Sequence, residues 1–432
     1  MRKFYFFVLI TTCLFAEKAM AQEKTDALLQ TIMQSSKQPV IQEVIRQPDK
    51  YRCQIIYTQI NRNKHNQPSF KNYYFNYNPA LYYNPASMVK MPLAFLSLEK
   101  LNQFNKKEVN KYTDVLIDSS YPGQVAMYHD STSANGFPSI AHFIKRAFLI
   151  SENDPYNRMY QFIGQEAINR SLHQKGYSGI RITRQFMGYS EEQNKHTNPF
   201  RFIGPDGNVL NAQPGAYNRQ PFNFGEEIKI GKAYLNRNDS LINEPFDFTK
   251  HNNVPLEDFQ QMLQAVLFPE SVPAQQRFDL SKDDRNFLLR YLSQYPSETD
   301  YPKYDTSLFY DSYVKNFFND GSRKIPAHIR VFNKVGWAYG FLTDVSYVID
   351  VKNNIEYMLS ATVYVNEDGV LNDSKYDYET TGQPFMNKMG QTIYDYELTR
   401  KRTSRPKLEG FNIHYNKRNK SDNRPSIKVV DN

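Results

Sequence analysis

The sequence predicts an α/β plus all-α architecture, in which an antiparallel sheet is built from both chain ends and a helical domain is inserted between them. Two observations predict it. Runs rich in aromatic and β-branched residues lie near the start of the chain (51–77) and again near its end (331–365). The long stretch between them has mainly helical spacing of apolar residues. Strands separated in this way can share one sheet, and the cleft between two such lobes is a usual place for a site.

Apolar periodicity predicts the individual elements in order along the chain. Residues 24–47 are expected to form a helix. The runs at 51–60 and 71–77, split by a polar turn at 61–68, are typical of a β-hairpin. The remaining predicted elements are helices at 88–101, 140–150, 156–163, 256–267 and 281–292, strands at 331–334, 344–351 and 357–365, and a closing helix at 385–398.

Changes in composition predict the domain boundaries. Residues 200–255 contain many Gly, Pro and Asn and are expected to be a loop-rich insert. No internal repeat of 20 to 50 residues is visible, which argues against solenoids and propellers. We therefore expect a signal peptide at 1–21, a discontinuous α/β lobe at about 40–85 and 325–399, a helical lobe at about 86–324 that carries the insert, and a basic, disordered tail at 400–432.

The first residues have the pattern of an export signal. Met1-Arg2-Lys3 is a positive start, residues 4–14 are almost all apolar, and Ala19-Met20-Ala21 provides small residues for cleavage after Ala21. A secreted or periplasmic protein is therefore expected. Lipidation at Cys13 is a weaker alternative, because threonine is a poor residue just before such a cysteine. No later stretch has the roughly 20 apolar residues needed to span a bilayer.

Cysteine content and charge narrow the class of protein further. Cys13 leaves with the signal, so Cys53 has no partner and no internal disulfide is expected. Residues 400–432 hold ten Lys and Arg and three acidic residues, which accounts for +7 of the +8 net charge. The rest of the chain is close to neutral, which argues against a nucleic-acid-binding surface. The tail is expected to make weak contact with anionic envelope surfaces.

A serine and a lysine three residues apart lie at the start of the largely apolar helix predicted at 88–101. Ser87 and Lys90 share a helix face, so the lysine can reach the serine hydroxyl and act as its base. The helix N-terminus also favours negative charge at Ser87. The spacing alone is weak, since Ser312 to Lys315 and Ser404 to Lys407 share it. A nucleophile and a base are two of the parts that acyl transfer needs.

Two further short motifs follow along the chain. Ser151-Glu152-Asn153 lies between two predicted helices, and Lys334-Val335-Gly336 lies at the end of a predicted strand, followed by Trp337. With residues 85–94, these patches resemble the S-x-x-K, S-D-N and K-T-G motifs of the class A β-lactamase and penicillin-binding-protein family. The likeness covers roughly residues 40–399 in layout, and only the three patches in close sequence. It implies a β-lactamase/transpeptidase-like fold.

The resemblance also implies roles for these residues. Ser87 would attack the substrate carbonyl with Lys90 as its base, and Ser151 would relay the proton to the leaving nitrogen. Asn153 would hold Lys90 and the substrate amide, while Lys334 would provide positive charge near Ser151. Gly336 belongs to the third motif, and the backbone N–H groups of Ser87 and Trp337 would form the oxyanion hole. The Trp337 side chain either lines the cleft or packs in the interior.

The sequence departs from the family at two places. Val335 stands where the family has a hydroxyl, and a valine methyl cannot donate a hydrogen bond to a substrate carboxylate. The loop glutamate that activates the deacylating water has no counterpart in residues 181–190. Glu191 or Glu192 either fills that role or is a solvated loop acid. A chain without this base would be a slow hydrolase, a peptidase or a transferase.

The sequence therefore predicts a secreted serine hydrolase with a small-molecule or peptide acyl substrate, acting on β-lactams or related amides and esters. A D-alanyl-peptidase or esterase of the same fold is the alternative within the enzyme class. A non-catalytic envelope binding or scaffold protein is the alternative of another class. No metal or cofactor is expected, because paired cysteines, HExxH and a Gly-rich phosphate loop are absent from the sequence.

Overall fold

A five-stranded sheet joins the two ends of the chain. The computed structural model describes residues 23–186 and 188–430, so the predicted signal peptide (1–21) lies outside the described residues. The strand order is β10-β11-β12-β1-β2, with neighbours paired antiparallel. The predicted sheet built from both chain ends is confirmed. Its strands are β1 (Gln54–Arg62), β2 (Pro68–Phe75), β10 (Ile329–Ala338), β11 (Phe341–Asp350) and β12 (Ile355–Tyr364).

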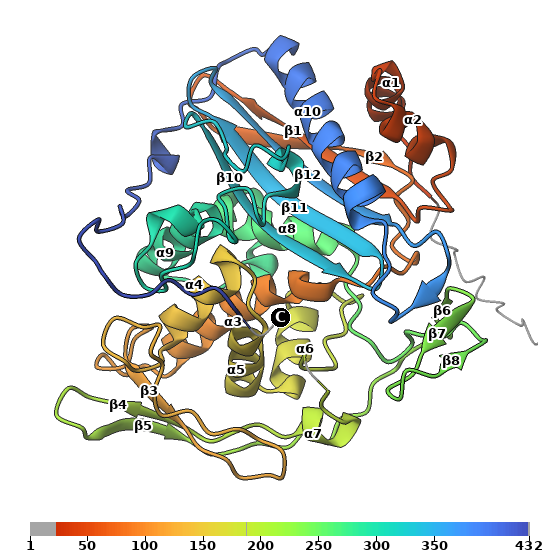
Figure 1. Cartoon of the computed structure of the whole chain (residues 1–432). Coiled ribbons are helices and arrows are strands. Elements are labelled where there is room, and N and C mark those ends of the chain that lie inside the picture. Colours follow the sequence, from red (N-terminus) through yellow and green to blue (C-terminus); the bar gives the residue numbers. More distant parts are fainter. Residues whose placement is uncertain (1–22, 187, 431–432) are drawn as a thin grey trace, which may run out of the picture.

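Helices cover both faces of this sheet. On one face lie α1 (Ala27–Ser35), α2 (Pro39–Arg46) and α10 (Gln383–Thr399), and on the other lie the helices of the second lobe (Figure 1). Every residue of β11 and β12 is buried, as expected of strands packed on both sides. The single helix predicted at 24–47 is wrong, because Pro39 lacks the N–H that a continuing helix needs and instead begins α2.

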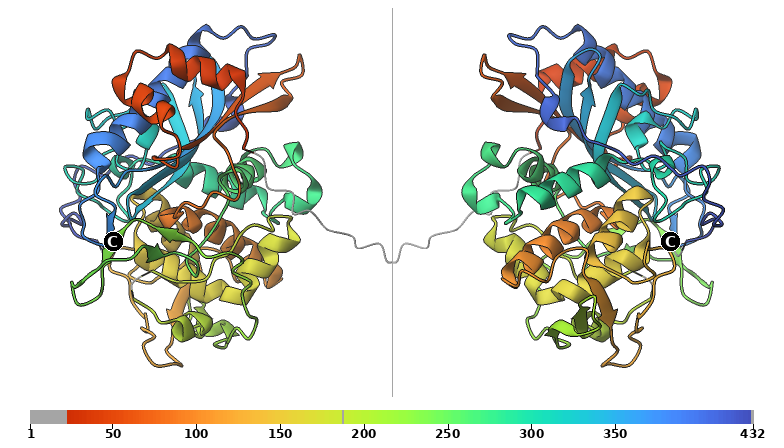
Figure 2. Two further views of the ribbon diagram at one scale, coloured as in Figure 1. Left: turned by 90° about the vertical axis from the view of Figure 1, so that its right-hand side faces the viewer. Right: turned by 90° about the vertical axis from the view of Figure 1, so that its left-hand side faces the viewer.

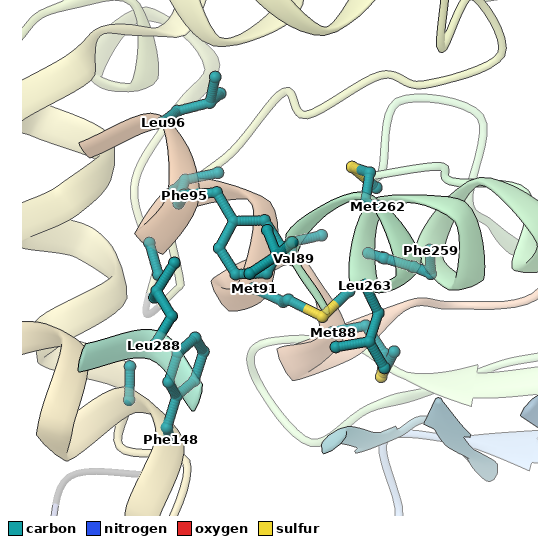
Figure 3. Packing of buried hydrophobic residues seen from close by; sticks show 14 of the residues in the cluster. Met88, Val89, Met91, Phe95, Leu96, Phe148, Phe259, Met262, Leu263 and Leu288 are labelled. Atoms are coloured by element: carbon teal, nitrogen blue, oxygen red, sulfur yellow. The ribbon is translucent and has the colours of Figure 1, made fainter. Parts of the chain in front are cut away.

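The helical lobe is packed around α3. Side chains of α8, α9 and α4, among them Phe259, Leu288 and Phe148, contact this helix from several sides (Figure 3). Residues 90–99 of this helix are all buried, as expected at such a central position. The helices of this lobe are α3 (Lys90–Gln103), α4 (Ile140–Leu149), α5 (Asn153–Ile163), α6 (Gln165–Gln174), α7 (Glu191–Lys195), α8 (Leu256–Leu267) and α9 (Lys282–Ser293).

The segment predicted as a loop-rich insert consists of long connections and short strands. Strand β4 pairs with β3 of the helical lobe, and β7 pairs with β13, which follows the large sheet in sequence. The insert is therefore tied to both lobes. The short strands are β3 (Asp114–Ile117), β4 (Phe200–Ile203), β5 (Val209–Gln213), β6 (Lys229–Ile230), β7 (Ala233–Leu235), β8 (Leu241–Ile242), β9 (Phe246–Asp247) and β13 (Val370–Leu371).

The basic tail runs from the end of α10 past α9 to the helical lobe (Figures 1 and 2). Residues 400–430, for which the sequence predicts disorder, have little regular secondary structure but make many contacts with the body. The domain boundaries remain predictions. The short single turns of the chain are η1 (Ala86–Val89), η2 (Pro269–Ser271), η3 (Ala274–Gln276), η4 (Pro296–Glu298), η5 (Asn316–Phe318), η6 (Tyr378–Gly382) and η7 (Glu409–Phe411).

Candidate active site

The candidate nucleophile lies on the short turn η1 that leads into α3. Ser87 is partly exposed, whereas Lys90 at the first position of α3 is fully buried. The Lys90 Nζ lies 2.8 Å from the Ser87 Oγ, within hydrogen-bond distance. Ala86 has φ +44°, an uncommon backbone conformation for alanine, and its N–H donates to the Asn84 side chain at 2.8 Å. This local turn aims the serine away from the apolar surface of α3.

The second patch closes around the same lysine. Ser151 lies in the loop between α4 and α5, and Asn153 is the first residue of α5. The Lys90 Nζ lies 3.3 Å from the Ser151 Oγ and 2.8 Å from the Asn153 Oδ1. The lysine also donates to the Ser151 backbone carbonyl. Ser151 has φ +69°, which turns its side chain and its carbonyl toward Lys90. The lysine is thus held by oxygen acceptors rather than by a carboxylate.

Strand β10 contributes the third patch. The Lys334 Nζ donates to the Ser151 Oγ at 2.7 Å and to the carbonyl of Val335 at 2.7 Å. At Gly336 the strand passes very close to η1, since a Cβ there would lie 2.4 Å from the carbonyl oxygen of Pro85. Only glycine allows this approach without displacing backbone. The sequence predicts the site to be where η1, the Ser151 loop and β10 meet, and these three elements lie together.

The Trp337 and Val335 side chains point away from Ser87, Lys90 and Ser151. The Trp337 ring packs with the cluster under α10 and lies 6.0 Å from the Tyr313 ring. Of the two interpretations of this side chain, the structure favours packing. Val335 is fully buried and stands opposite Asp344 in the β10–β11 pairing. Only the backbone N–H of Trp337 is therefore relevant to an oxyanion.

Burial sets the charge of the two site lysines. Desolvation lowers the pKa of Lys90 well below its usual value; the charge of Lys334 lowers it further, and the Glu152 carboxylate opposes this. Burial likewise lowers the pKa of Lys334, with Asp344 opposing it. A lysine with a lowered pKa can be neutral near pH 7 and can accept a proton.

The loop that follows α6 presents no acid to the site. Glu191 and Glu192 are exposed and pair with Lys250 at 2.8 Å and Lys195 at 3.1 Å. In the part of the chain that the structure describes, no carboxylate contacts Ser87 or Lys90. Instead the Phe186 ring lies 5.2 Å from the Lys90 Nζ. Of the two interpretations of these glutamates, the geometry supports solvated loop acids.

Sequence analysis missed the residues that hold this surrounding in place. The Phe186 ring stacks on the Tyr156 ring, with 4.3 Å between their centroids. The backbone N–H of Phe186 donates to the Asn157 Oδ1 at 2.8 Å, and the Asn157 Nδ2 donates to the Phe186 carbonyl at 3.1 Å. The Glu152 carboxylate accepts from Arg146 at 2.7 Å and from the Tyr304 hydroxyl. In the sequence, an aromatic residue in a polar loop is a weak signal for the contacts of Phe186. Nothing near Glu152 in the sequence indicates its bonds with Arg146 and Tyr304.

Among the described residues, no group of three or more His, Cys, Asp or Glu side chains is placed so that it could hold a metal ion. Within the described residues no helix is long and apolar enough to cross a membrane.

The match to a family model agrees with the resemblance seen in the motifs. Residues 37–205 match the model of the "Beta-lactamase enzyme family". No curated protein matches the chain in sequence. Among solved structures, the chain is similar to a β-lactamase from Sphaerobacter thermophilus (12% identity, 85% of this chain and 96% of that chain covered, TM-score 0.45). It is also similar to one from Burkholderia vietnamiensis (12% identity, 87% and 98% covered, TM-score 0.47).

Proposed function

We propose, from the match of residues 37–205 to the β-lactamase enzyme family, that the chain is a serine hydrolase that forms an acyl-enzyme on Ser87. The observation that carries the proposal is the 2.8 Å distance between the Lys90 Nζ and the Ser87 Oγ. A partly exposed serine beside a buried lysine of lowered pKa has the properties of an activated nucleophile.

In the proposed acylation, neutral Lys90 accepts the hydroxyl proton of Ser87 while its Oγ attacks the substrate carbonyl carbon. The carbonyl electron pair moves to oxygen, where the backbone N–H groups of Ser87 and Trp337 hold the oxyanion. When the intermediate collapses, the leaving nitrogen takes a proton from the Ser151 Oγ, and Lys90 returns its proton to Ser151 across 3.3 Å. Lys334 holds the Ser151 Oγ in place at 2.7 Å.

Deacylation is proposed to be slow. It needs a water that is positioned and deprotonated beside the ester, and a carboxylate normally provides this. Here the Phe186 ring faces Lys90, and the two nearby glutamates are paired with surface lysines. The acyl-enzyme should therefore persist, and it should react with water far more slowly than it forms.

The substrate class that fits this site is a β-lactam or a related amide or ester, with a D-alanyl-peptide as the alternative. A non-catalytic scaffold protein is less well supported, because a degenerate site would not need the Lys90 Nζ within hydrogen-bond distance of Ser87. Export to the periplasm or beyond is part of the same proposal and is supported by residues 1–21 of the sequence.

The test uses a fluorescent penicillin and a fluorophosphonate probe on the mature protein. We expect covalent labelling that is lost in Ser87→Ala, and an adduct whose mass persists over a time course in excess probe. Absence of labelling by either probe on a folded protein would contradict the acyl-enzyme. Labelling with rapid multiple turnover of penicillin would contradict slow deacylation only.

A further inference from the structure

A cavity is lined by the loop that leads into and out of the Phe186 region. It has a volume of about 600 Å³ and is bounded by the loop at 183–195 and by the inserted segment at 217–251. This size lies in the range of small-ligand sites. Neither the motifs nor the proposed mechanism uses it.

The charged side chains of this cavity are mainly cationic. Lys250 is paired with Glu191 at 2.8 Å, and Lys195 with Glu192 at 3.1 Å. Arg219 and Arg237 also line the cavity, and in the described part of the chain neither forms an ion pair with a carboxylate. Two exposed guanidinium groups are thus left to bind an anion, and their planar donors match a carboxylate.

Other lining groups suit a peptide better than a bare ion. Tyr189, Tyr217 and Phe222 present aromatic surface, and the buried amide of Asn218 is bonded to the Gln165 side chain and to the backbone N–H of Gln220. Apolar walls with a few amide and charged groups are typical of sites for organic ligands. An inorganic anion would use the arginines alone.

The cavity and the catalytic groups share a wall. The Arg184 carbonyl accepts from the Tyr156 hydroxyl at 2.8 Å, and Tyr156 stacks on Phe186, whose ring lies 5.2 Å from the Lys90 Nζ. On the other side, the His251 ring lies 5.8 Å from Tyr339, which follows Trp337 by two residues. The Tyr156–Phe186 pair therefore stands between Arg184 of the cavity wall and Lys90.

We propose that the cavity binds a carboxylate-bearing, peptide-like part of the acyl donor whose carbonyl lies at Ser87. The assignment rests on the proposed function for the position of that carbonyl. Val335 cannot donate a hydrogen bond to a substrate carboxylate. In this assignment the arginines of the cavity, which lie outside the third motif, bind the carboxylate instead.

The experiment measures equilibrium binding to full-length Ser87→Ala protein, in which acylation does not occur. The probes are acetyl-Ala-Glu-Glu and its neutral counterpart, acetyl-Ala-Gln-Gln-amide, titrated by calorimetry. We expect the acidic peptide to bind at least about tenfold more tightly, and Arg219→Glu with Arg237→Glu to remove that preference. The matched control reverses two exposed charges on the β1–β2 hairpin, Lys64→Glu with Lys71→Glu, and should keep it.

Three outcomes would overturn the assignment. The two peptides could bind equally, the arginine variant could bind like the control, or inorganic phosphate could displace the acidic peptide at equal concentration. In a second arm, the acidic peptide should slow the labelling of wild-type Ser87 by a neutral fluorophosphonate. If the peptide binds but does not slow labelling, the cavity is not part of the acyl-donor site. If wild type is never labelled, the proposed function fails while the binding result stands.

A different set of contacts concerns the tail. Ile427 bonds to the segment around Tyr304, since its N–H donates to Lys303 at 2.8 Å and its carbonyl accepts from Asp305 at 2.9 Å. Arg418 donates to the carbonyls of Thr299 and Pro296, each at 2.9 Å. The tail therefore holds the 296–305 segment along its length.

That segment in turn supports the Ser151 loop. Ile427 and Val430 pack against a buried cluster that contains Leu149, Ile150 and Tyr304. Leu149 and Ile150 directly precede Ser151, and the Tyr304 hydroxyl donates to the Glu152 carboxylate. We infer that the tail at 415–430 is a positioning element that holds Ser151 and Glu152 in register with Lys90.

The test compares Ile427→Asp with Val429→Asp, a matched control because Val429 is 84% exposed on the same tail. Both variants add one negative charge. The readout is the pH dependence of Ser87 labelling by a neutral fluorophosphonate, with Tyr304→Phe alongside. The charges acting on Lys90 are Lys334 and Glu152, and Glu152 raises its pKa. Displacing Glu152 should therefore slow labelling by about tenfold and move the midpoint to lower pH.

Val429→Asp should behave like wild type. If Ile427→Asp matches this control at every pH, the tail does not position the site. An equal loss of rate at all pH values, without a shifted midpoint, would also overturn the inference, because it would reflect general destabilisation.

Discussion

Among the residues that the structure describes, two buried lysines follow a serine by three residues, and the two pairs differ in geometry. The Lys90 Nζ lies 2.8 Å from the Ser87 Oγ, and Ser87 is partly exposed. The Lys315 Nζ donates instead to the carbonyls of Leu292 (2.8 Å) and Val331 (3.0 Å). Ser312 is fully buried, with its Oγ 3.5 Å from Asn319.

The electrostatic surroundings of the two lysines differ as well. Burial lowers the pKa of both. Lys315 is opposed by the buried charge of Asp344, to which it is linked through Asn333 (2.6 Å to its Oδ1). Lys90 has another cation, Lys334, as a close neighbour. The spacing alone thus places a lysine near a serine, whereas the accessible serine and the lack of a carboxylate partner for the lysine distinguish the Ser87–Lys90 pair.

The largest expected effect concerns chemistry. Lys90→Met should lower the rate of Ser87 labelling by about 10²- to 10⁴-fold, since it removes the general base. Ser312→Ala should label at the wild-type rate. The measurement is the second-order rate constant with a fluorophosphonate. A Lys90→Met variant that labels normally would break the comparison.

The next effect concerns the stability of the fold. Here the larger effect is expected at Lys315 and the smaller one at Lys90. Lys315→Met should lower the free energy of unfolding by about 3–5 kcal/mol, because it leaves Asp344 buried without its compensating charge. Lys90→Met should destabilise the fold less, because Lys90 is bonded only to neutral oxygen acceptors and its loss leaves no buried carboxylate without a compensating charge. Urea unfolding of both variants checks this. Equal destabilisation would show that Lys90 is a structural lysine like Lys315.

The pH dependence of labelling sharpens the role of Lys90. Its pKa is lowered, so the neutral amine that accepts the proton forms at lower pH than in an ordinary lysine. Labelling should therefore rise with pH through this lowered pKa and level off well below pH 10.5. Rates from pH 5 to 10.5, corrected with Ser87→Ala, provide the measurement. A rise that continues to pH 10.5 would mean that Lys90 stays charged.

The smallest effects are expected at the loop acids. Glu191→Gln and Glu192→Gln should leave the lifetime of the penicillin adduct unchanged, because both side chains are exposed and paired with lysines. Intact mass over a time course gives that lifetime. If either change traps an adduct that wild type releases quickly, that glutamate activates the deacylating water.

The sequence predicted those parts of the molecule that depend on local pattern. The strands of the sheet, the helix after Ser87 and the meeting of Ser87, Ser151 and Lys334 follow from periodicity and motif order. The break before Pro39 was missed because the apolar pattern continues across it. The contacts of Phe186 with Lys90 and of Ile427 with the Tyr304 segment join residues far apart in sequence. They depend on loop paths that no periodicity describes.

The central claim is that Ser87, rather than another serine, is the nucleophile. The most direct measurement is peptide mapping by mass spectrometry after wild-type protein reacts with a fluorophosphonate. We expect one adduct, located on the peptide that contains Ser87, and none on the peptide that contains Ser312. An adduct on any other serine, or no adduct on a folded protein, would contradict it.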